Sequence, residues 1–136
     1  MIVLVVDGMG GGLGKAVVEA LVGAGLPDGT EIIVAGTNSI ATATMLKGGA
    51  VAGATGENAI AYNARRADYI IGSSGIVIGN SMYGEISPAI ASAISCAGAM
   101  KILLPVSKCN AVFLGTETKP LSSLLPEMIK ILKSGG

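Results

Sequence analysis

The feature that most limits the fold is the N-terminal stretch VLVVDGMGGGLGKAVVEA, residues Val3 to Ala20, where an apolar run leads through a glycine-dense turn into a helical pattern. The apolar run predicts a buried β-strand, and the spacing of Ala16, Val17 and Ala20 predicts a helix with one apolar face. At such a junction the glycines let the backbone approach an anion, and the first N–H groups of the helix point toward it. The sequence therefore predicts a binding corner for negative charge, but it indicates no reaction.

The composition fits one compact domain, expected to span residues 1–136. Hydrophobic residues make up 51% of the chain, which suffices to fill a core at this length. Only 13% of the residues are charged and the formal net charge is zero, so the polar surface is thin for a monomer. We therefore expect the protein to form a homo-oligomer.

Several functional classes are disfavoured by the residue types present. Nine Lys and Arg balance nine Asp and Glu, and the chain has no Trp, so we expect no nucleic-acid partner. There is no His, and Cys96 and Cys109 lack the spacing of a zinc site, so we expect no metal site and no His-based catalytic triad. The apolar stretch from Ala89 to Met100 falls short of the ~20 residues of a membrane helix, and the first strand has no leader pattern. A cytoplasmic protein without membrane contact is expected.

Apolar runs alternate with helical patterns along the chain, which favours a parallel sheet covered on both faces. The predicted fold class is therefore α/β, a three-layer α/β/α arrangement with a mostly parallel sheet of about five strands. The strands are predicted at Ile2–Val6, Glu31–Ala35, Tyr69–Ile71, Lys101–Pro105 and Ala111–Leu114. Helices are predicted from Gly12 to Ala24, from the caps Thr37, Asn38 and Ser39 to Gly48, from the cap Thr55 to Ala64, from Ser87 and Pro88 to Ala97, and after Pro120.

The glycine turn, Gly8 to Gly14, resembles the GxxxGxG turn of the short-chain dehydrogenases and reductases. The second predicted strand begins near residue 31, as the same strand–helix–strand unit requires. That family's catalytic YxxxK is absent, since none of the three tyrosines has a lysine four positions later. The second strand also ends without the acidic residue that holds a ribose diol. The resemblance implies that a nucleotide or dinucleotide is a compatible cofactor, and it leaves hydride transfer by that mechanism unsupported.

Two readings of the turn are open. The glycines can serve a phosphate-bearing ligand, or they can simply allow the strand and the helix to pack closely. Asp7, at the end of the first strand, can bind Mg²⁺ or act as a nucleophile, but we prefer the interpretation in which its carboxylate accepts hydrogen bonds from its own turn. Lys15 can reach a phosphate, although a lysine at this point of a helix is usually solvated.

Turns after three of the predicted strands are small and polar, and in a doubly wound sheet such turns converge at the carboxyl ends of the strands. Their backbone N–H groups, hydroxyls and one amide side chain suit a small phosphorylated ligand. The residues predicted to bind it are Asp7, Gly8, Gly10, Gly11, Gly12, Gly14, Thr37, Asn38, Ser73 and Ser74.

A carboxylate-dependent enzyme is the alternative, because a chain without His must move protons with other groups. Its candidates are Asp7, Glu57 and Glu85, with a borrowed metal and a site shared between subunits. Whether the chain is an enzyme is thus left open, and no catalytic residue is assigned. A scaffold subunit for another protein is a third reading. Cys109, beside Lys108, is interpreted as a small apolar filler rather than as a reactive thiol.

Over nearly its whole length the chain resembles a family of small bacterial proteins classed as a domain of unknown function. The resemblance is carried, in this order, by DGMGGGLGKA, AGTNSIATATMLKGGA, GATGENAI, GNSMYGEISP and LPVSKCN. It implies a stand-alone Rossmann-like domain and no particular activity. Our leading hypothesis is therefore a homo-oligomeric module that binds a nucleotide or another phosphate-bearing metabolite at the first strand-to-helix turn.

Overall fold

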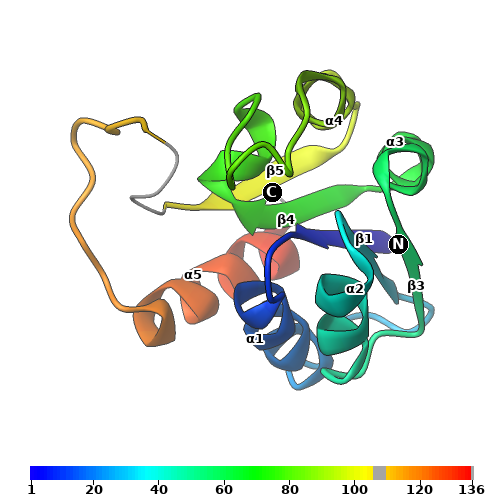
Figure 1. Cartoon of the computed structure of the whole chain (residues 1–136). Coiled ribbons are helices and arrows are strands. Elements are labelled where there is room, and N and C mark those ends of the chain that lie inside the picture. Colours follow the sequence, from blue (N-terminus) through cyan, green and yellow to red (C-terminus); the bar gives the residue numbers. More distant parts are fainter. Residues whose placement is uncertain (106–109, 136) are drawn as a thin grey trace.

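A computed structural model describes residues 1–105 and 110–135. Five strands alternate with helices along the chain, so the predicted α/β class is confirmed (Figure 1). The strands are β1 (Ile2–Asp7), β2 (Glu31–Gly36), β3 (Ala52–Thr55), β4 (Tyr69–Ser73) and β5 (Met100–Leu104). The helices are α1 (Gly12–Val22), α2 (Ser39–Leu46), α3 (Glu57–Arg66), α4 (Pro88–Ser95) and α5 (Leu121–Ser134), with a 3-10 turn, η1 (Ser74–Val77), after β4.

The sheet has the order β3-β2-β1-β4-β5, and every pairing is parallel. The chain builds outward from β1 through β2 to β3, then returns to the other side of β1 for β4 and β5. In open parallel sheets, ligands bind beyond the carboxyl ends of the strands where the winding direction reverses. Here that position lies between β1 and β4.

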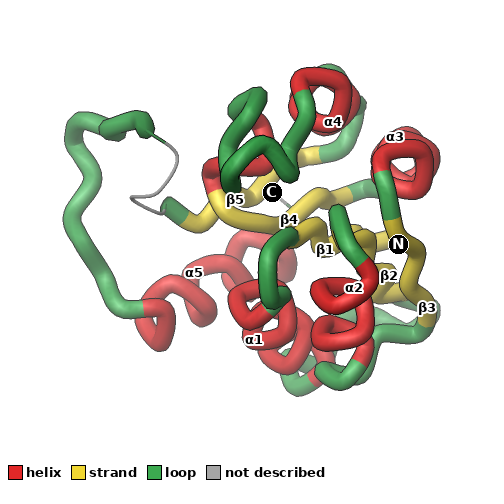
Figure 2. The backbone as a smooth tube through the Cα atoms, viewed as in Figure 1, coloured by secondary structure: helices red, strands yellow, loops and turns green. Residues whose placement is uncertain are grey.

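Both faces of the sheet are covered, which confirms the three layers (Figure 2). Side chains alternate along β1, so that Val3 and Val5 pack against α1, α2 and α5, whereas Leu4 and Val6 pack against α3, α4 and η1. All four side chains are fully buried, which explains the continuous apolar run of this strand. None of the helices formed by the described residues is long and apolar enough to cross a membrane.

Polar caps position two of the helices as predicted. The Asn38 side chain accepts a hydrogen bond from the N–H of Ala41 at the start of α2 (2.8 Å). The Ser87 hydroxyl accepts one from Ile90 at the start of α4 (3.1 Å). The cap predicted at Thr55 is wrong, because Thr55 ends β3 and Gly56 precedes α3.

One strand was predicted in the wrong place. Residues Ala111–Leu114 form no strand, and the described part of the connection from β5 to α5 is an irregular segment that leaves the body of the molecule (Figure 1). The strand that was not predicted from the sequence is β3. It lies at the sheet edge and is mostly exposed, and its sequence Ala-Gly-Ala-Thr contains no large apolar side chain. Cys109 and its neighbour Lys108 lie outside the described residues.

Candidate functional site

The glycine turn joins the carboxyl end of β1 to the first turn of α1. The Gly8 carbonyl accepts a hydrogen bond from the Gly11 N–H (3.0 Å), which closes the turn, and Gly11 precedes the helix with φ +76°. The turn therefore lies at the carboxyl edge of the sheet, at the end of β1, which is one of the two strands that flank the reversal of winding.

The side chain of Asp7 holds the two ends of this turn together by hydrogen bonds. Its side chain is 6% exposed, and its two carboxylate oxygens accept hydrogen bonds from the N–H groups of Gly8 and Gly14, each over 2.8 Å. Burial raises the pKa of Asp7 above its ordinary value, although the two hydrogen bonds from Gly14 and Gly8 oppose that rise. Both oxygens are thus engaged by the turn itself, as the preferred interpretation of Asp7 had it.

A second carboxylate, Glu85, reaches the same turn from the loop before α4. Its Oε1 accepts three hydrogen bonds, from the Met9 N–H (2.9 Å), the Thr37 hydroxyl (2.6 Å) and the Asn38 side-chain amide (2.9 Å). These bonds, led by that from Thr37, hold the pKa of Glu85 below its ordinary value. From the sequence, Glu85 is a candidate for proton transfer within a polar cluster, Asn80 to Glu85, that can line the crevice; no local pattern predicts its bonds to the first turn.

Thr37 and Asn38, which were predicted to bind the ligand, donate hydrogen bonds to protein atoms instead. Thr37 donates its hydroxyl to Glu85, and the Asn38 amide donates both to Glu85 and to the Met9 carbonyl (3.0 Å). The other side-chain atom of Asn38, its oxygen, caps α2. Both residues follow β2 directly, so the effect of these bonds is to fix the Glu85 carboxylate beyond the end of β2.

At three glycines of the turn a Cβ would collide with a neighbouring residue. A Cβ on Gly8 would lie 2.8 Å from the Thr37 hydroxyl oxygen, and one on Gly14 would collide with the Met45 sulfur. Gly11 combines its left-handed backbone with a hypothetical Cβ only 2.7 Å from the Ala41 carbonyl oxygen. The packing interpretation of the turn is therefore correct for these three positions.

Gly10 and Gly12 differ from the other three. A Cβ on either would meet nothing within 4 Å, neither has a left-handed backbone, and both are exposed. Among the described residues, the N–H groups of Gly10, Gly12 and Leu13 have no hydrogen-bond acceptor, whereas those of Gly8, Met9, Gly11 and Gly14 each have one. The fold itself gives no reason for glycine at these two positions.

Two serines at the carboxyl end of β4, the strand on the other side of β1 from β2, are buried at the same edge of the sheet. Ser73 ends β4 with 2% exposure, and its hydroxyl is the one buried side-chain polar atom of the described residues that lacks a hydrogen-bond partner. Side chains alternate along β4, where Tyr69 and Ile71 face α1, so Ser73 faces the same layer. Ser74 begins η1 and is 3% exposed.

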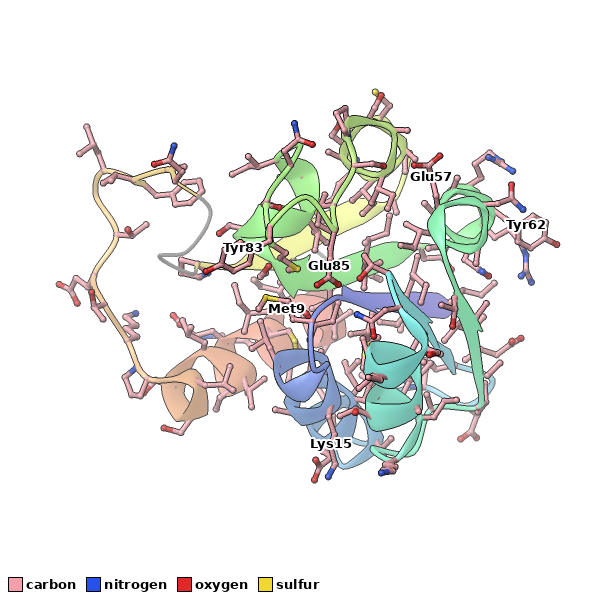
Figure 3. The ribbon with its side chains drawn as sticks, viewed as in Figure 1. Met9, Lys15, Glu57, Tyr62, Tyr83 and Glu85 are labelled. Atoms are coloured by element: carbon pink, nitrogen blue, oxygen red, sulfur yellow. The ribbon has the colours of Figure 1, made fainter. Side chains whose placement is uncertain are left out.

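The remaining candidates lie elsewhere. Glu57 is exposed at the start of α3, where it accepts a hydrogen bond from the Ser87 hydroxyl (2.5 Å), and Figure 3 shows it apart from Glu85 and Met9. In the same view the Lys15 side chain extends away from Glu85. The described residues contain no group of three His, Cys, Asp or Glu side chains that could hold a metal ion. Of the three carboxylates proposed for an enzyme, only Asp7 and Glu85 therefore bond to the same turn.

Left-handed backbone conformations occur on both segments that meet here. Met9 has φ 52°, and Asn80, Met82 and Tyr83 have φ 66°, 56° and 56°. Such conformations are costly for residues other than glycine and are frequent at binding sites.

A surface cavity of about 890 Å³ opens at the other end of the sheet, near Met1 and Gly98, and none of the predicted binding residues lines it.

Comparison with known protein families gives one match. A family model described as "Domain of unknown function (DUF3842)" matches residues 2–135. Neither the curated proteins nor the solved structures yield a match.

Proposed function

Since the chain belongs to the family described as Domain of unknown function (DUF3842), which names no activity, we propose a function from its own geometry. We propose that the protein is a binding module for a nucleotide or another phosphate-bearing metabolite, held at the corner between β1 and α1.

The observation that carries the proposal is the pair Gly10 and Gly12. Neither glycine is needed for packing or for backbone conformation, yet each leaves the main chain bare beside an N–H group without an acceptor. A phosphate oxygen needs such a surface, because a Cβ would hold it away from the N–H groups. The unbonded Leu13 N–H, in the first turn of α1, adds a third donor and the positive end of the helix dipole.

Ser73 supports the same position. A buried hydroxyl without a partner costs about 1–3 kcal/mol, so its presence asks for an explanation. Ser73 ends the strand next to β1 and faces the layer that contains α1. Because this hydroxyl is buried, a ligand at the winding reversal would supply the missing hydrogen bond only after a neighbouring side chain moves aside.

The two carboxylates limit where the phosphate can bind. Asp7 occupies the N–H groups of Gly8 and Gly14, and Glu85 occupies that of Met9. A further anion on those groups would face negative charge at close range. The proposed phosphate position is therefore confined to the donors of Gly10, Gly12 and Leu13.

The alternative of a carboxylate-dependent enzyme has less support. Both oxygens of Asp7 are bound by backbone N–H groups, and Glu57 is bonded to Ser87 away from the turn. A general acid or base must be able to reach a substrate proton. Asp7 is buried and both of its oxygens are bonded to the turn, so it does not meet this requirement.

A thermal-shift titration tests the proposal directly, with inorganic pyrophosphate and a panel of nucleotides as probes. A ligand at ~100 times its Kd adds about 2.7 kcal/mol to the free energy of unfolding, which is readily measured as a rise in Tm. We expect at least one phosphorylated compound to give such a rise. If none does at millimolar concentration, the proposal is wrong.

Self-association is proposed on a separate observation. Val112, Phe113 and Leu114, on the irregular segment after β5, are 87%, 42% and 93% exposed. Three consecutive apolar side chains on a segment that leaves the body would be costly in water. We propose that a second copy of the chain covers them.

A further inference from the structure

Glu85 occupies the place beyond the end of β2. Its carboxylate is bonded there by Thr37 and Asn38, the two residues that follow this strand. In dinucleotide-binding folds, an acidic residue near this point, borne by the strand itself, accepts hydrogen bonds from the hydroxyls of a ribose. In this chain β2 carries no such residue, and a loop 48 residues farther on supplies the carboxylate instead.

The two oxygens of Glu85 are not equivalent. Oε1 takes all three hydrogen bonds, whereas Oε2 accepts none from the described residues. Three donors on one oxygen fix the position of the carboxylate and favour its charged form. The second oxygen is thus a fixed, charged acceptor at the edge of the turn, where the side chain is only partly buried.

A partner for Oε2 has to donate hydrogen bonds and cannot be an anion. Glu85 and Asp7 already repel one another, since the charge of Glu85 contributes to the raised pKa of Asp7. A phosphate at Glu85 would add further negative charge at the same point. A vicinal diol is neutral, and its two hydroxyls suit a carboxylate acceptor.

The spacing along the turn separates two kinds of contact. Met9, which holds Glu85, and Gly12, which begins α1 with a free N–H, are three residues apart on the same turn. The turn thus presents an acceptor for hydroxyls on one side and donors for a phosphate on the other. A ligand that joins a diol to a phosphate through a short link matches both sides.

We propose that the ligand is a nucleotide with an unmodified ribose, and that Glu85 binds its 2′- and 3′-hydroxyls. The proposal rests on the function proposed above and adds a specificity to it. Nucleotides with a 2′-phosphate are excluded by charge, and 2′-deoxynucleotides lose a hydrogen bond to a charged acceptor.

Glu85 could instead act as an internal anion that fills the phosphate position. The distribution of free donors argues against this role. The carboxylate is bonded to the Met9 N–H and to side chains after β2, and it leaves the N–H groups of Gly10, Gly12 and Leu13 unbonded. The two roles also predict opposite effects when the charge of Glu85 is removed.

The test is isothermal titration calorimetry on the full chain at pH 7. The probes are the four common ribonucleoside diphosphates, their 2′-deoxy counterparts and inorganic pyrophosphate. For the wild type we expect at least one ribonucleoside diphosphate to bind at least tenfold more tightly than its 2′-deoxy counterpart. Glu85→Gln should abolish this preference and leave the affinity for pyrophosphate within twofold. The control Glu57→Gln, which neutralises a carboxylate outside the turn, should bind all probes as the wild type does.

The outcomes separate the two proposals. If ribo- and deoxyribonucleotides bind the wild type equally, the ribose role is wrong while the phosphate site stands, and this comparison depends on no variant. If Glu85→Gln tightens pyrophosphate binding, Glu85 is a competing anion and the ribose role is equally wrong. If no probe binds at all, the phosphate site itself is refuted.

Discussion

The N–H of Met9 donates a 2.9 Å hydrogen bond to Glu85 Oε1, across 76 residues of sequence. This bond joins the glycine turn after β1 to the loop before α4. Both segments have left-handed backbone close to the bond, at Met9 on one side and at Met82 and Tyr83 on the other. The strained conformations are therefore located where the two segments hold each other, and the predictions below follow from that arrangement and from the glycines beside it.

The first prediction concerns Gly12→Ala, with Gly10→Ala as its companion. Neither new Cβ meets a neighbour, so we expect the free energy of unfolding to stay the same or to rise by about 0.5 kcal/mol. Nucleotide or pyrophosphate affinity should fall at least tenfold in calorimetry, because the methyl group blocks approach to the N–H groups. Gly98→Ala, an exposed glycine with equally open surroundings outside the turn, is the matched control. Unchanged affinity in both turn variants would refute contact with the bare backbone.

Gly11→Ala should behave in the opposite way. Its φ of +76° disfavours alanine, and the new Cβ would lie 2.7 Å from the Ala41 carbonyl oxygen, which is backbone and cannot move aside cheaply. We expect a loss of about 2 kcal/mol or more in chemical denaturation, against almost none for the adjacent Gly12→Ala. Equal stabilities of the two variants would show that the packing of α1 against α2 is misdescribed.

Removing the unpartnered hydroxyl of Ser73 should stabilise the protein. In Ser73→Ala the buried polar atom without a hydrogen bond is lost, so we expect the free energy of unfolding to rise by about 1 kcal/mol in the absence of ligand. Ser81→Ala is the contrasting variant, since the Ser81 hydroxyl, on a residue that is also buried, donates to the Gly75 carbonyl and its loss should cost about 1 kcal/mol. The prediction fails if Ser73→Ala is the less stable of the two.

The pH dependence of stability should report the charge of Glu85. Its folded-state pKa lies below the ordinary value of 4.5, so in the folded protein the carboxylate keeps its charge to lower pH than in the unfolded chain. The resulting stabilisation is full above pH 4.5 and is lost as the pH falls through the folded-state pKa. We expect the wild type to exceed Glu85→Gln by about 1 kcal/mol at pH 7, a modest value because the side chain is partly exposed.

Urea denaturation of both proteins between pH 7 and pH 3 checks this dependence. The raised pKa of Asp7 acts in the opposite sense and lowers stability as the pH rises. Both proteins carry Asp7, so the larger part of that effect, which comes from burial, cancels in the difference between them, and only the smaller part due to the charge of Glu85 does not. A difference that is constant with pH, or that grows on acidification, would contradict the assigned hydrogen bonds.

Charge on the apolar segment after β5 should prevent self-association. We expect light scattering to find an oligomer for the wild type and a monomer for Val112→Glu combined with Leu114→Glu, because the carboxylates would be buried between copies. Thr118→Glu places a single charge of the same sign on the same exposed segment and should leave the oligomer intact. A wild type that is monomeric at micromolar concentration would end this proposal.

The sheet could be predicted because β1, β2 and β4 are buried on both faces, and burial leaves continuous apolar runs in the sequence. Edge strand β3 has no such run, since Ala52 is exposed and a Cβ on Gly53 would already lie 3.0 Å from the side chains of Leu46 and Val34. The apolar residues at Ala111–Leu114 gave the opposite error. Their pattern is that of a strand, but nothing in the described chain pairs with them.

The site could be predicted only where its parts are local in sequence. The corner between β1 and α1, the hydrogen bonds of Asp7 to its own turn and the cap at Asn38 each depend on residues within a few positions of one another. Glu85 depends on a contact between distant segments, which no local pattern reports. The sequence also does not distinguish Gly11 from Gly12. The difference depends on α2, because a Cβ on Gly11 would collide with the Ala41 backbone and a Cβ on Gly12 would meet nothing.

The origin of Glu85 has a consequence during synthesis on the ribosome. The glycine turn and both residues that follow β2 are synthesised before residue 85, and β4, which pairs with β1, lies between them and Glu85 in the chain. On the proposed function, a nascent chain would therefore acquire its donors for phosphate before its acceptor for sugar hydroxyls. Discrimination between sugars would then be a property that a newly made molecule gains only when its sheet has closed around β1.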